Sequence, residues 1–427
     1  MDYLQLNDEQ LSRELHLRRK DYERIREKDL KLDMSRGKPC KEQLDISEGL
    51  LTVLNCNDDC VDETGMDCRN YGILDGISEA KKLFADLMEV SENELIIGGN
   101  SSLNMMYDTI IRTMIFGVDG VSEPWGKYEK ITFLCPVPGY DRHFSICESL
   151  GINMVSVPLK ADGPDMDMIE KLVAEDDSIK GMWSIPKYSN PTGITYSDDV
   201  VRRLAALKPK AKDFRIFWDN AYIVHDLNEK GDKLLNLLEE AKKYGNEDMV
   251  YMFMSTSKVS FPGAGVAAMA ASAKNIAYVK KKIFSQTIGP DKLNQLRHVR
   301  YFKTADGVRE YMKKHAEIIK PRFDVVLEFL SKELGGLGVA EWFEPRGGYF
   351  VSVNVENGCA KRVVALLKDA GVTMTGAGAT FPYGKDPEDR NIRIAPSYPP
   401  IDELRTAMEL FCICAKLAAV EKYLETK

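Results

Sequence analysis

Five side chains that could do chemistry together follow short apolar runs in the middle of the chain. They supply a carboxylate, a phenol, a hydroxyl, an amine and an amide: Asp219, Tyr222, Ser255, Lys258 and Asn190. Taken singly, an acid or an amide in such a place is usually a cap or a turn residue, and a lysine is usually solvated. Because the five follow one another at the ends of successive runs, we interpret them as parts of one site.

These groups match the needs of an aldehyde cofactor that carries a pyridine ring and a phosphate. Lys258 is the candidate amine for the imine, and burial or nearby positive charge would help it lose its proton. Asp219 is the candidate for the ring nitrogen, because a carboxylate there keeps the ring protonated. Tyr222 and Asn190 are the candidates for hydrogen bonds to the ring oxygen.

The phosphate of such a cofactor needs hydrogen-bond donors. Asn100, Ser101 and Ser102 lie where a short apolar run passes into a helical pattern. The free N–H groups and the dipole of a helix N-terminus favour an anion. We therefore expect the phosphate at these three residues, with Ser255 as a further donor.

The elements that must position these groups alternate between helical patterns and short runs rich in Ile, Val, Phe and Met. The runs predict strands at 95–97, 131–135, 154–158, 181–185, 214–218 and 250–254. This alternation predicts an α/β fold with a mostly parallel sheet covered by helices. Ligands bind at the carboxyl ends of the strands in such sheets, which is where the candidate residues lie.

The pattern changes after a long helical stretch at 308–333. Later segments predict strands at 341–354, 372–375 and 391–395 and helices at 360–370 and 401–424, while an amphipathic helix is expected at 8–30. We predict three parts: an N-terminal helix or arm that belongs to the small domain (1–49), a large cofactor-binding domain (50–310) and a small α+β C-terminal domain (311–427).

Composition narrows the class of partner. The chain has 427 residues, with 58 Lys and Arg against 66 Asp and Glu, for a formal net charge of −8. This balance argues against a nucleic acid or an anionic membrane as partner and favours a small molecule. No window approaches the ~20 apolar residues of a membrane span, and no apolar leader is evident, so we expect a cytoplasmic protein.

The cysteines and histidines do not indicate a metal site. The nine cysteines include no C-x-x-C pair, and the five histidines include no H-E-x-x-H. We expect most cysteines to be reduced thiols and no metal to be bound. His143 follows Tyr140 by three residues and is expected to border the pocket in a packing role.

The order and spacing of several motifs resemble those of the fold-type-I, class I aminotransferases, the pyridoxal-phosphate (PLP) family that includes aspartate aminotransferase. The motifs lie at 70–72, 100–102, 138–140, 190–193, 219–222, 255–258, 345–350 and 391–394. The resemblance covers nearly the whole chain and implies a large domain with a mostly parallel seven-stranded sheet plus a smaller α+β domain. Segments 35–39, 187–193 and 294–298 are most similar to the type Ic aspartate aminotransferases.

The resemblance also implies roles for individual residues. Lys258 would hold PLP as a Schiff base and then shuttle a proton at the substrate α-carbon. Tyr140 would stack on the pyridine ring. Tyr71 would reach the phosphate in the neighbouring subunit of a homodimer. Arg393 would bind the substrate α-carboxylate with its planar, permanently charged fork, and Asn190 would also contact the substrate.

One segment departs from the family pattern. Most class I members carry an arginine shortly after the lysine as a phosphate ligand, but residues 260–266 contain no positive charge. The phosphate site would then depend on hydroxyls, backbone amides and another cation.

The resemblance implies transfer of the amino group from L-aspartate to 2-oxoglutarate, in two half-reactions that yield oxaloacetate and L-glutamate. The substrate side chain would need a second cation. We rank Arg36 first because it precedes Gly37, which in the family lies beside the substrate carboxylate. Arg297 and Lys187 are the other candidates.

Other functions of the same fold remain open at this point. They are a broad-specificity or aromatic aminotransferase, a lyase, and a transcription regulator with an aminotransferase-like domain. For a regulator, the roughly 30 residues of charge-rich chain before Ser35 are too few for a DNA-binding module and show no basic face.

Overall fold

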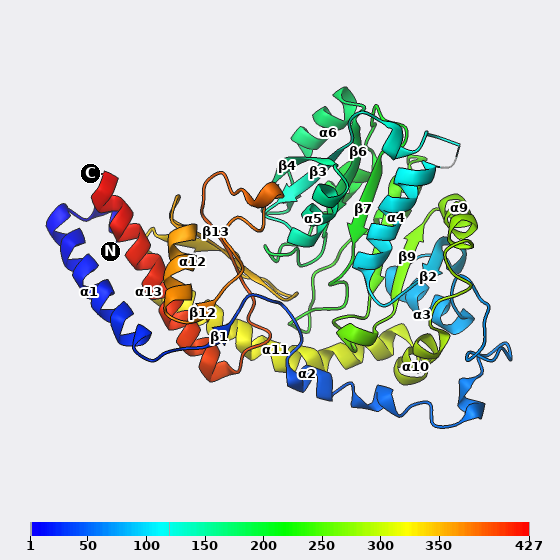
Figure 1. Cartoon of the computed structure of the whole chain (residues 1–427), viewed down its shortest axis with the longest axis horizontal. Coiled ribbons are helices and arrows are strands. Elements are labelled where there is room, and N and C mark those ends of the chain that lie inside the picture. Colours follow the sequence, from blue (N-terminus) through cyan, green and yellow to red (C-terminus); the bar gives the residue numbers. More distant parts are fainter. Residues whose placement is uncertain (1, 119, 427) are drawn as a thin grey trace.

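A computed structural model describes residues 2–118 and 120–426 of the chain. Its larger sheet has the strand order β2-β9-β8-β7-β6-β3-β4-β5 (Figure 1). The strands are β2 (Leu95–Ile97), β3 (Thr132–Val137), β4 (Asn153–Lys160), β5 (Gly163–Pro164), β6 (Ile179–Ser184), β7 (Arg215–Asp219), β8 (Val250–Ser255) and β9 (Ala267–Ala271). Strands β4, β3, β6, β7 and β8 run parallel, which confirms the expected mostly parallel sheet.

The six strands expected from apolar runs all form, with limits shifted by a few residues. Two further strands were not expected: β9, which contains no Ile, Val or Phe, and β5, a two-residue antiparallel strand at the edge. The sheet therefore has eight strands, one more than the seven that the resemblance implied. Strand β9 has the sequence Ala-Ala-Met-Ala-Ala, and alanine is depleted in strands. It forms because β2 and β8 pair with it on both sides in antiparallel register.

Helices cover both faces of this sheet. They are α3 (Ser78–Met88), α4 (Ser102–Phe116), α5 (Asp141–Ser149), α6 (Met166–Glu175), α7 (Asp198–Ala205), α8 (Leu237–Lys242), α9 (Ala273–Ile283) and α10 (Lys292–Phe302). One hydrophobic cluster packs α3, α6, α7, α8 and α10 on one face, and another packs α4, α5 and α9 on the other. Burial of both faces explains why the strands read as continuous apolar runs.

The second part of the chain has its own sheets. Strands β10 (Ala340–Trp342), β11 (Val351–Val355) and β13 (Asn391–Ile394) form an antiparallel sheet in that order, and β1 (Leu32–Asp33) pairs in parallel with β12 (Val372–Thr373). The strand expected at 341–354 is therefore two strands, because residues 343–350 form a loop between them. Helices α11 (Ala305–Leu334), α12 (Ala360–Asp369) and α13 (Ile401–Thr426) pack on this region.

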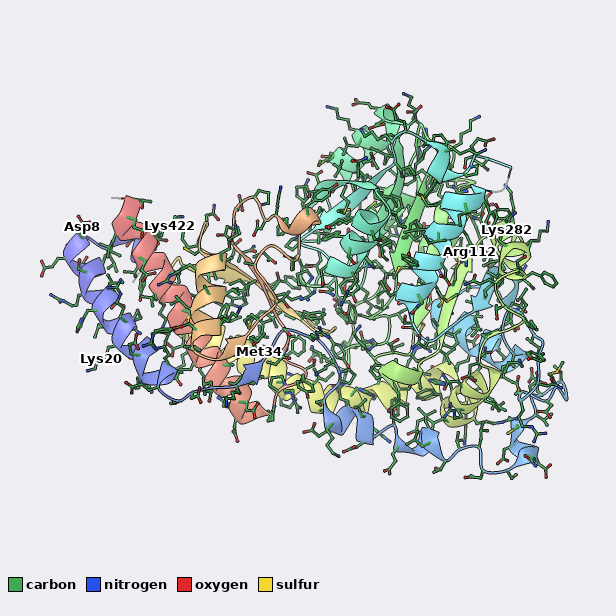
Figure 2. All side chains as sticks on the ribbon, viewed as in Figure 1. Asp8, Lys20, Met34, Arg112, Lys282 and Lys422 are labelled. Atoms are coloured by element: carbon green, nitrogen blue, oxygen red, sulfur yellow. The ribbon has the colours of Figure 1, made fainter. Side chains whose placement is uncertain are left out.

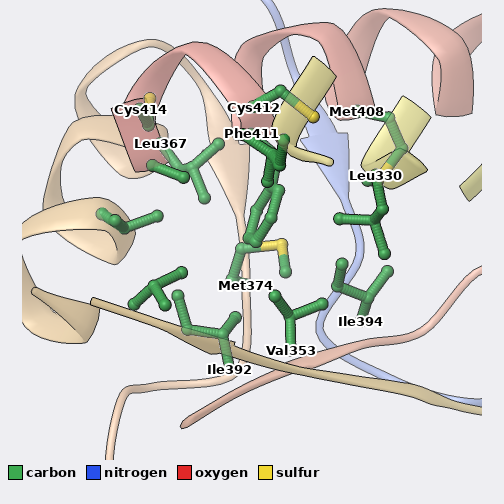
Figure 3. Packing of buried hydrophobic residues seen from close by; sticks show 14 of the residues in the cluster. Leu330, Val353, Leu367, Met374, Ile392, Ile394, Met408, Phe411, Cys412 and Cys414 are labelled. Atoms are coloured by element: carbon green, nitrogen blue, oxygen red, sulfur yellow. The ribbon is translucent and has the colours of Figure 1, made fainter. Parts of the chain in front are cut away.

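Residues from both ends of the chain share one core. The N-terminal helix α1 (Asp8–Arg26), which carries Asp8 and Lys20, lies alongside α13, which carries Lys422 (Figures 1 and 2). Figure 3 shows Phe411 of α13 pointing toward Met374 and Val353 in the core beside the antiparallel sheet. This shared core favours grouping the N-terminal helix with the C-terminal part, but the limits at 49/50 and 310/311 stay a prediction.

Short elements complete the fold. Helix α2 spans Lys41–Asp45, and 3-10 helices span Tyr3–Gln5, Glu48–Leu51, Asn57–Cys60, Glu92–Glu94, Trp125–Lys127, Glu247–Met249, Pro262–Ala264 and Pro382–Gly384. Within the described residues, we find no helix that combines the length and apolarity required to cross a bilayer.

Candidate active site

The carboxyl ends of β6, β7 and β8 bring the sequence-predicted residues together. These three strands are neighbours in the sheet and parallel, so the segments that follow them emerge at one edge. Asp219 is the last residue of β7, Ser255 is the last residue of β8, and Asn190 lies in the turn after β6. All three side chains are buried.

The two carboxylate oxygens of Asp219 have different surroundings. Its Oδ2 lies 3.2 Å from Nε2 of His143, whose ring stacks on Trp183 with ring centres 4.2 Å apart. Its Oδ1 is buried and has no hydrogen-bond partner among the described residues. A buried carboxylate oxygen is costly to leave unsatisfied, so this position fits a ligand that donates a proton, such as a protonated pyridine nitrogen.

Lys258 lies in the turn after β8 and is half-buried. Its Nζ is 5.1 Å from the ring centre of Tyr222 and 5.8 Å from that of Tyr349. Burial lowers the pKa of Lys258, the charge of Arg393 lowers it further, and Asp219 opposes both effects. A lowered pKa favours the neutral amine, which is the form that attacks an aldehyde.

Arg393 reaches the site from β13 of the smaller sheet and is buried. Its Nη1 donates to Oδ1 of Asp141 at 2.9 Å and to Oδ1 of Asn190 at 3.2 Å. Its Nη2 donates to Oγ1 of Thr375 at 3.3 Å, and its Cζ lies 4.9 Å from the ring centre of Phe350. These contacts fix the plane of a guanidinium that can bind a carboxylate.

Two segments that the sequence predicted for the phosphate lie against each other. Oγ of Ser257 donates to the carbonyl of Asn100 at 3.1 Å and lies 3.0 Å from Oγ of Ser255. Ser101 is the N-cap of α4, where its Oγ accepts from the backbone N–H of Asn104. Hydroxyls and helix N–H groups therefore gather at the N-terminus of α4, as an anion site requires.

Close backbone approach explains a glycine in this cluster. A Cβ on Gly265 would lie 2.8 Å from the carbonyl oxygen of Asn100 and 3.1 Å from the nitrogen of Ser257. Any larger residue at this position would separate the helix α4 terminus from the turn that carries Lys258.

Two aromatic residues predicted for the cofactor lie near Asp219. Tyr140 packs edge-on against His143 with ring centres 5.0 Å apart, and burial raises the pKa of Tyr140 to about 12. Tyr222 is buried, and burial raises its pKa well above the ordinary value. Both phenols therefore stay protonated near neutral pH and can donate a hydrogen bond.

The other residues predicted for the cofactor or the substrate make no recorded contact with Lys258 within the single chain. The side chain of Tyr71 is exposed, and so is that of Arg36. Gly37 packs on Phe350, since a Cβ there would overlap the phenyl ring. Arg297 on α10 is partly buried, and its Nε has no partner among the described residues.

The side chain of Lys187 points into a cavity other than the candidate active site. Its Nζ lies 2.9 Å from Oδ1 of Asp226 and donates to the carbonyl of Ile223 at 3.0 Å. These residues line a cavity of about 1090 Å³ that also borders Trp218. Trp218 and Asp219 are consecutive in β7, so their side chains point to opposite faces of the sheet.

Four of the five histidines lie around the candidate site. Of these four, the sequence analysis expected only His143 there. Nε2 of His225 is 3.3 Å from the carbonyl oxygen of Lys258, and Nε2 of His298 is 2.8 Å from Oγ of Ser260. Nδ1 of His315 is 2.9 Å from Nε2 of Gln43, which also donates to Tyr349. The histidines come from separate elements, so their spacing carried no signal. In the described part of the chain, no group of His, Cys, Asp and Glu is arranged to hold a metal ion.

Comparison with known proteins identifies the family. The family model described as aspartate amino-transferase matches residues 6–427. An aspartate aminotransferase of Corynebacterium glutamicum is 46% identical over 95% of this chain and 93% of its own length. The crystal structure of an aspartate transaminase from that species matches with a TM-score of 0.97 at 44% identity and covers 99% of both chains. An aromatic-amino-acid aminotransferase of Thermococcus litoralis is 27% identical over 60% of each chain. The chain therefore belongs to the aspartate aminotransferase family and has the fold type I of the PLP-dependent transferases.

Proposed function

We propose that this enzyme is an aspartate aminotransferase that uses PLP to move the amino group of L-aspartate to 2-oxoglutarate, with oxaloacetate and L-glutamate as products. The observation that carries the proposal is that Oδ1 of Asp219 is buried without a partner among residues 2–118 and 120–426, in a site that also holds Lys258 and Arg393. When bound, PLP supplies an aldehyde for an amine and a ring that withdraws electrons from the substrate α-carbon.

The residues around the ring have distinct tasks in this proposal. Asp219 holds a proton on the ring nitrogen through Oδ1, while His143 keeps its Oδ2 in place. Tyr222 and Asn190 would donate to the ring oxygen, and Tyr140 would stack on the ring. Asn100, Ser101, Ser102 and Ser255 would hold the phosphate.

Lys258 and Arg393 act on the substrate. Nζ of Lys258 would be the amine that holds the aldehyde carbon of PLP, and as a free amine it would move the proton of the substrate α-carbon. Arg393 binds the α-carboxylate in a bidentate manner and so orients that carbon toward Lys258.

Aspartate specificity requires a second cation, and Arg36 is our first candidate. The side chain of Arg36 forms no hydrogen bond or salt bridge with the described residues, although its backbone carbonyl accepts from the N–H of Lys38. Its neighbour Gly37 packs on the Phe350 ring that stacks against Arg393. Lys187 is already paired with Asp226, which weakens its candidacy. Arg297 remains a candidate if a second subunit brings it to the site.

We also propose that the enzyme is a cytoplasmic homodimer in which Tyr71 reaches the phosphate of the partner subunit. Tyr71 is 78% exposed, Phe284 is 77% exposed and Ile288 is 59% exposed. These residues belong to adjacent segments, because Lys292 donates to the carbonyl of Gly72 at 2.9 Å. Apolar side chains exposed together favour burial by a second copy.

The first test is covalent. The protein incubated with PLP and reduced with borohydride should carry the cofactor on Lys258, as mapped by peptide mass spectrometry. Lys258→Ala should carry none at that position. A colourless wild-type protein, or a label on another lysine, would contradict the proposal.

The second test is specificity. With 2-oxoglutarate as acceptor, aspartate should be a better donor than alanine or phenylalanine, and Arg36→Ala should lose that preference. Lys38→Ala, two residues away and stacked over Tyr398, is the matched control. Equal rates with all three donors would instead favour a broad-specificity or aromatic aminotransferase, as the name of the Thermococcus litoralis relative suggests. Retention of aspartate preference in Arg36→Ala would shift the role to Arg297.

A further inference from the structure

The turn that carries Lys258 is closed on itself and paired with the next strand. The carbonyl oxygen of Thr256 accepts from the N–H groups of Val259 and Ser260, both at 2.9 Å. Thr256 also pairs with Val266, through its own N–H and through Oγ1, again at 2.9 Å each. The backbone of residues 256–260 is therefore a defined unit, and the position of Lys258 follows from where this unit is anchored.

One buried histidine of α10 contacts both hydroxyls of this turn. Nε2 of His298 is 2.8 Å from Oγ of Ser260 and 3.0 Å from Oγ1 of Thr256. Nδ1 of His298 is 2.7 Å from the carbonyl oxygen of Asn294, which can only accept a hydrogen bond. Nδ1 must therefore carry the proton, and Nε2 is left as the acceptor for the two hydroxyls.

The neutral form of His298 is secured by its surroundings. The ring is 2% exposed, and burial lowers the pKa of His298 to about 4. A protonated ring would turn Nε2 into a donor and break the contact in which the hydroxyls donate.

The same face of α10 also contacts residues 264–265, which lie after the turn that carries Lys258. Nδ2 of Asn294, one helical turn before His298, donates to the carbonyl oxygens of Ala264 and Gly265, at 2.9 Å each. Helix α10 thus contacts both ends of the stretch 256–265, which lacks the arginine found in most class I members.

We propose that His298 is a positioning residue for Lys258, because it anchors the hydroxyls of Thr256 and Ser260 on helix α10. This inference rests on the proposed function, since it concerns the amine that bonds PLP. His298 has no part in the bond-making steps. Its contribution is to keep the reacting nitrogen aligned with the cofactor and the substrate, and small displacements of a reacting group cost large factors in rate.

Two substitutions of His298 distinguish the effect of its hydrogen bonds from the effect of its packing. His298→Phe keeps a ring of similar size beside Phe302, whose ring centre is 6.0 Å away, but removes the acceptor. His298→Gln keeps a carbonyl that can accept from the hydroxyls. We expect His298→Phe to lower kcat and the rate of adduct formation at Lys258 by about tenfold, with KM for aspartate changed less than threefold, and we expect His298→Gln to retain most of both rates.

Hydrogen exchange supplies a readout that does not depend on activity. The amides of Val259 and Ser260 should exchange faster in His298→Phe than in the wild type, while amides of β7 keep their protection. His16→Gln, on the exposed face of α1, is the control and should change neither rate nor exchange. Ser260→Ala, a smaller change at the other end of the contact, should reproduce part of the effect if His298→Phe folds poorly.

The outcomes decide between the two claims. Equal losses in His298→Phe and His298→Gln, or unchanged exchange of residues 256–260 in His298→Phe, would overturn the positioning role. Failure of the wild type to form an adduct at Lys258 would overturn the proposed function instead, and the exchange experiment would still show whether His298 anchors the turn.

Discussion

Nε2 of His143 lies 3.2 Å from Oδ2 of Asp219, while Oδ1 of the same carboxylate is buried and has no hydrogen-bond partner in the part of the chain that the structure describes. The stack of His143 on Trp183 fixes the ring, so the carboxylate is oriented before any ligand arrives. Oδ1 of Asp219 is therefore the atom of the site that most directly indicates a ligand with a hydrogen-bond donor.

Replacing Asp219 tests that feature. Asp219→Asn keeps the shape but removes the negative charge that holds the ring proton, so we expect kcat to fall at least hundredfold, equivalent to about 2.7 kcal/mol of barrier. Steady-state kinetics with aspartate and spectroscopic titration with PLP measure the two consequences. Asp199→Asn on the exposed side of α7 should behave as the wild type. Full activity in Asp219→Asn would rule out the assigned role.

Arg393 should act through its fork rather than its charge alone. Arg393→Lys keeps the charge but loses the bidentate geometry, so KM for both aspartate and 2-oxoglutarate should rise about tenfold or more. Arg390→Lys, three residues earlier and paired with Glu341 and Glu388, is the matched control. An increase in KM for only one of the two substrates would argue against binding of the α-carboxylate, which both share.

Stability should depend on pH through the buried histidines. Burial lowers the pKa of His298 and that of His315 from 6.5 to about 4 in each case. Between these pH values the unfolded chain binds more protons than the folded chain, so the free energy of unfolding falls as the pH drops from 6.5 toward 4. Each unit of pKa difference is worth about 1.4 kcal/mol.

Urea unfolding at about pH 7 and about pH 5 measures this loss. His315→Gln removes one of the titrating groups and should lose less stability over this interval than the wild type. His16→Gln, which is exposed, should show the wild-type slope. An identical slope in His315→Gln would mean that other groups carry the dependence.

A buried ion pair lies at the amino ends of β6 and β7, away from the candidate site at their carboxyl ends. We expect this pair to contribute to stability and not to catalysis. Lys180 at the start of β6 lies 2.8 Å from Asp213, which also accepts from Nε1 of Trp125 at 2.9 Å. Lys180→Met leaves a buried carboxylate without its cation, so we expect a loss of about 3–5 kcal/mol in the free energy of unfolding. Lys127→Met breaks an exposed pair with Glu123 and should cost at most about 1 kcal/mol. A decrease in kcat of folded Lys180→Met would contradict this separation.

Much of the fold was predictable because it is encoded locally. Apart from Arg215, residues 214–218 and 250–254 are mainly apolar on both faces, and polar residues follow them. Both the strands and the side chains at their ends could therefore be predicted. Strand β9 could not, because its alanines are placed by pairing with β2 and β8 rather than by their own preference. The loop at 343–350, which divides the strand expected at 341–354, was also hidden because its flanks have strand composition.

The sequence by itself determined which chemical groups the enzyme has and the order in which they leave the strands: Asp219 after β7, Lys258 after β8, and Arg393 in a later strand. Only the tertiary structure decided that Lys187 faces Asp226 in another cavity, that His143 contacts Asp219, and that His225, His298 and His315 lie against the turn that carries Lys258. The physical reason is that local patterns specify strands and helices, whereas burial, hydrogen-bond partners and pKa shifts arise from contacts between segments far apart in the chain.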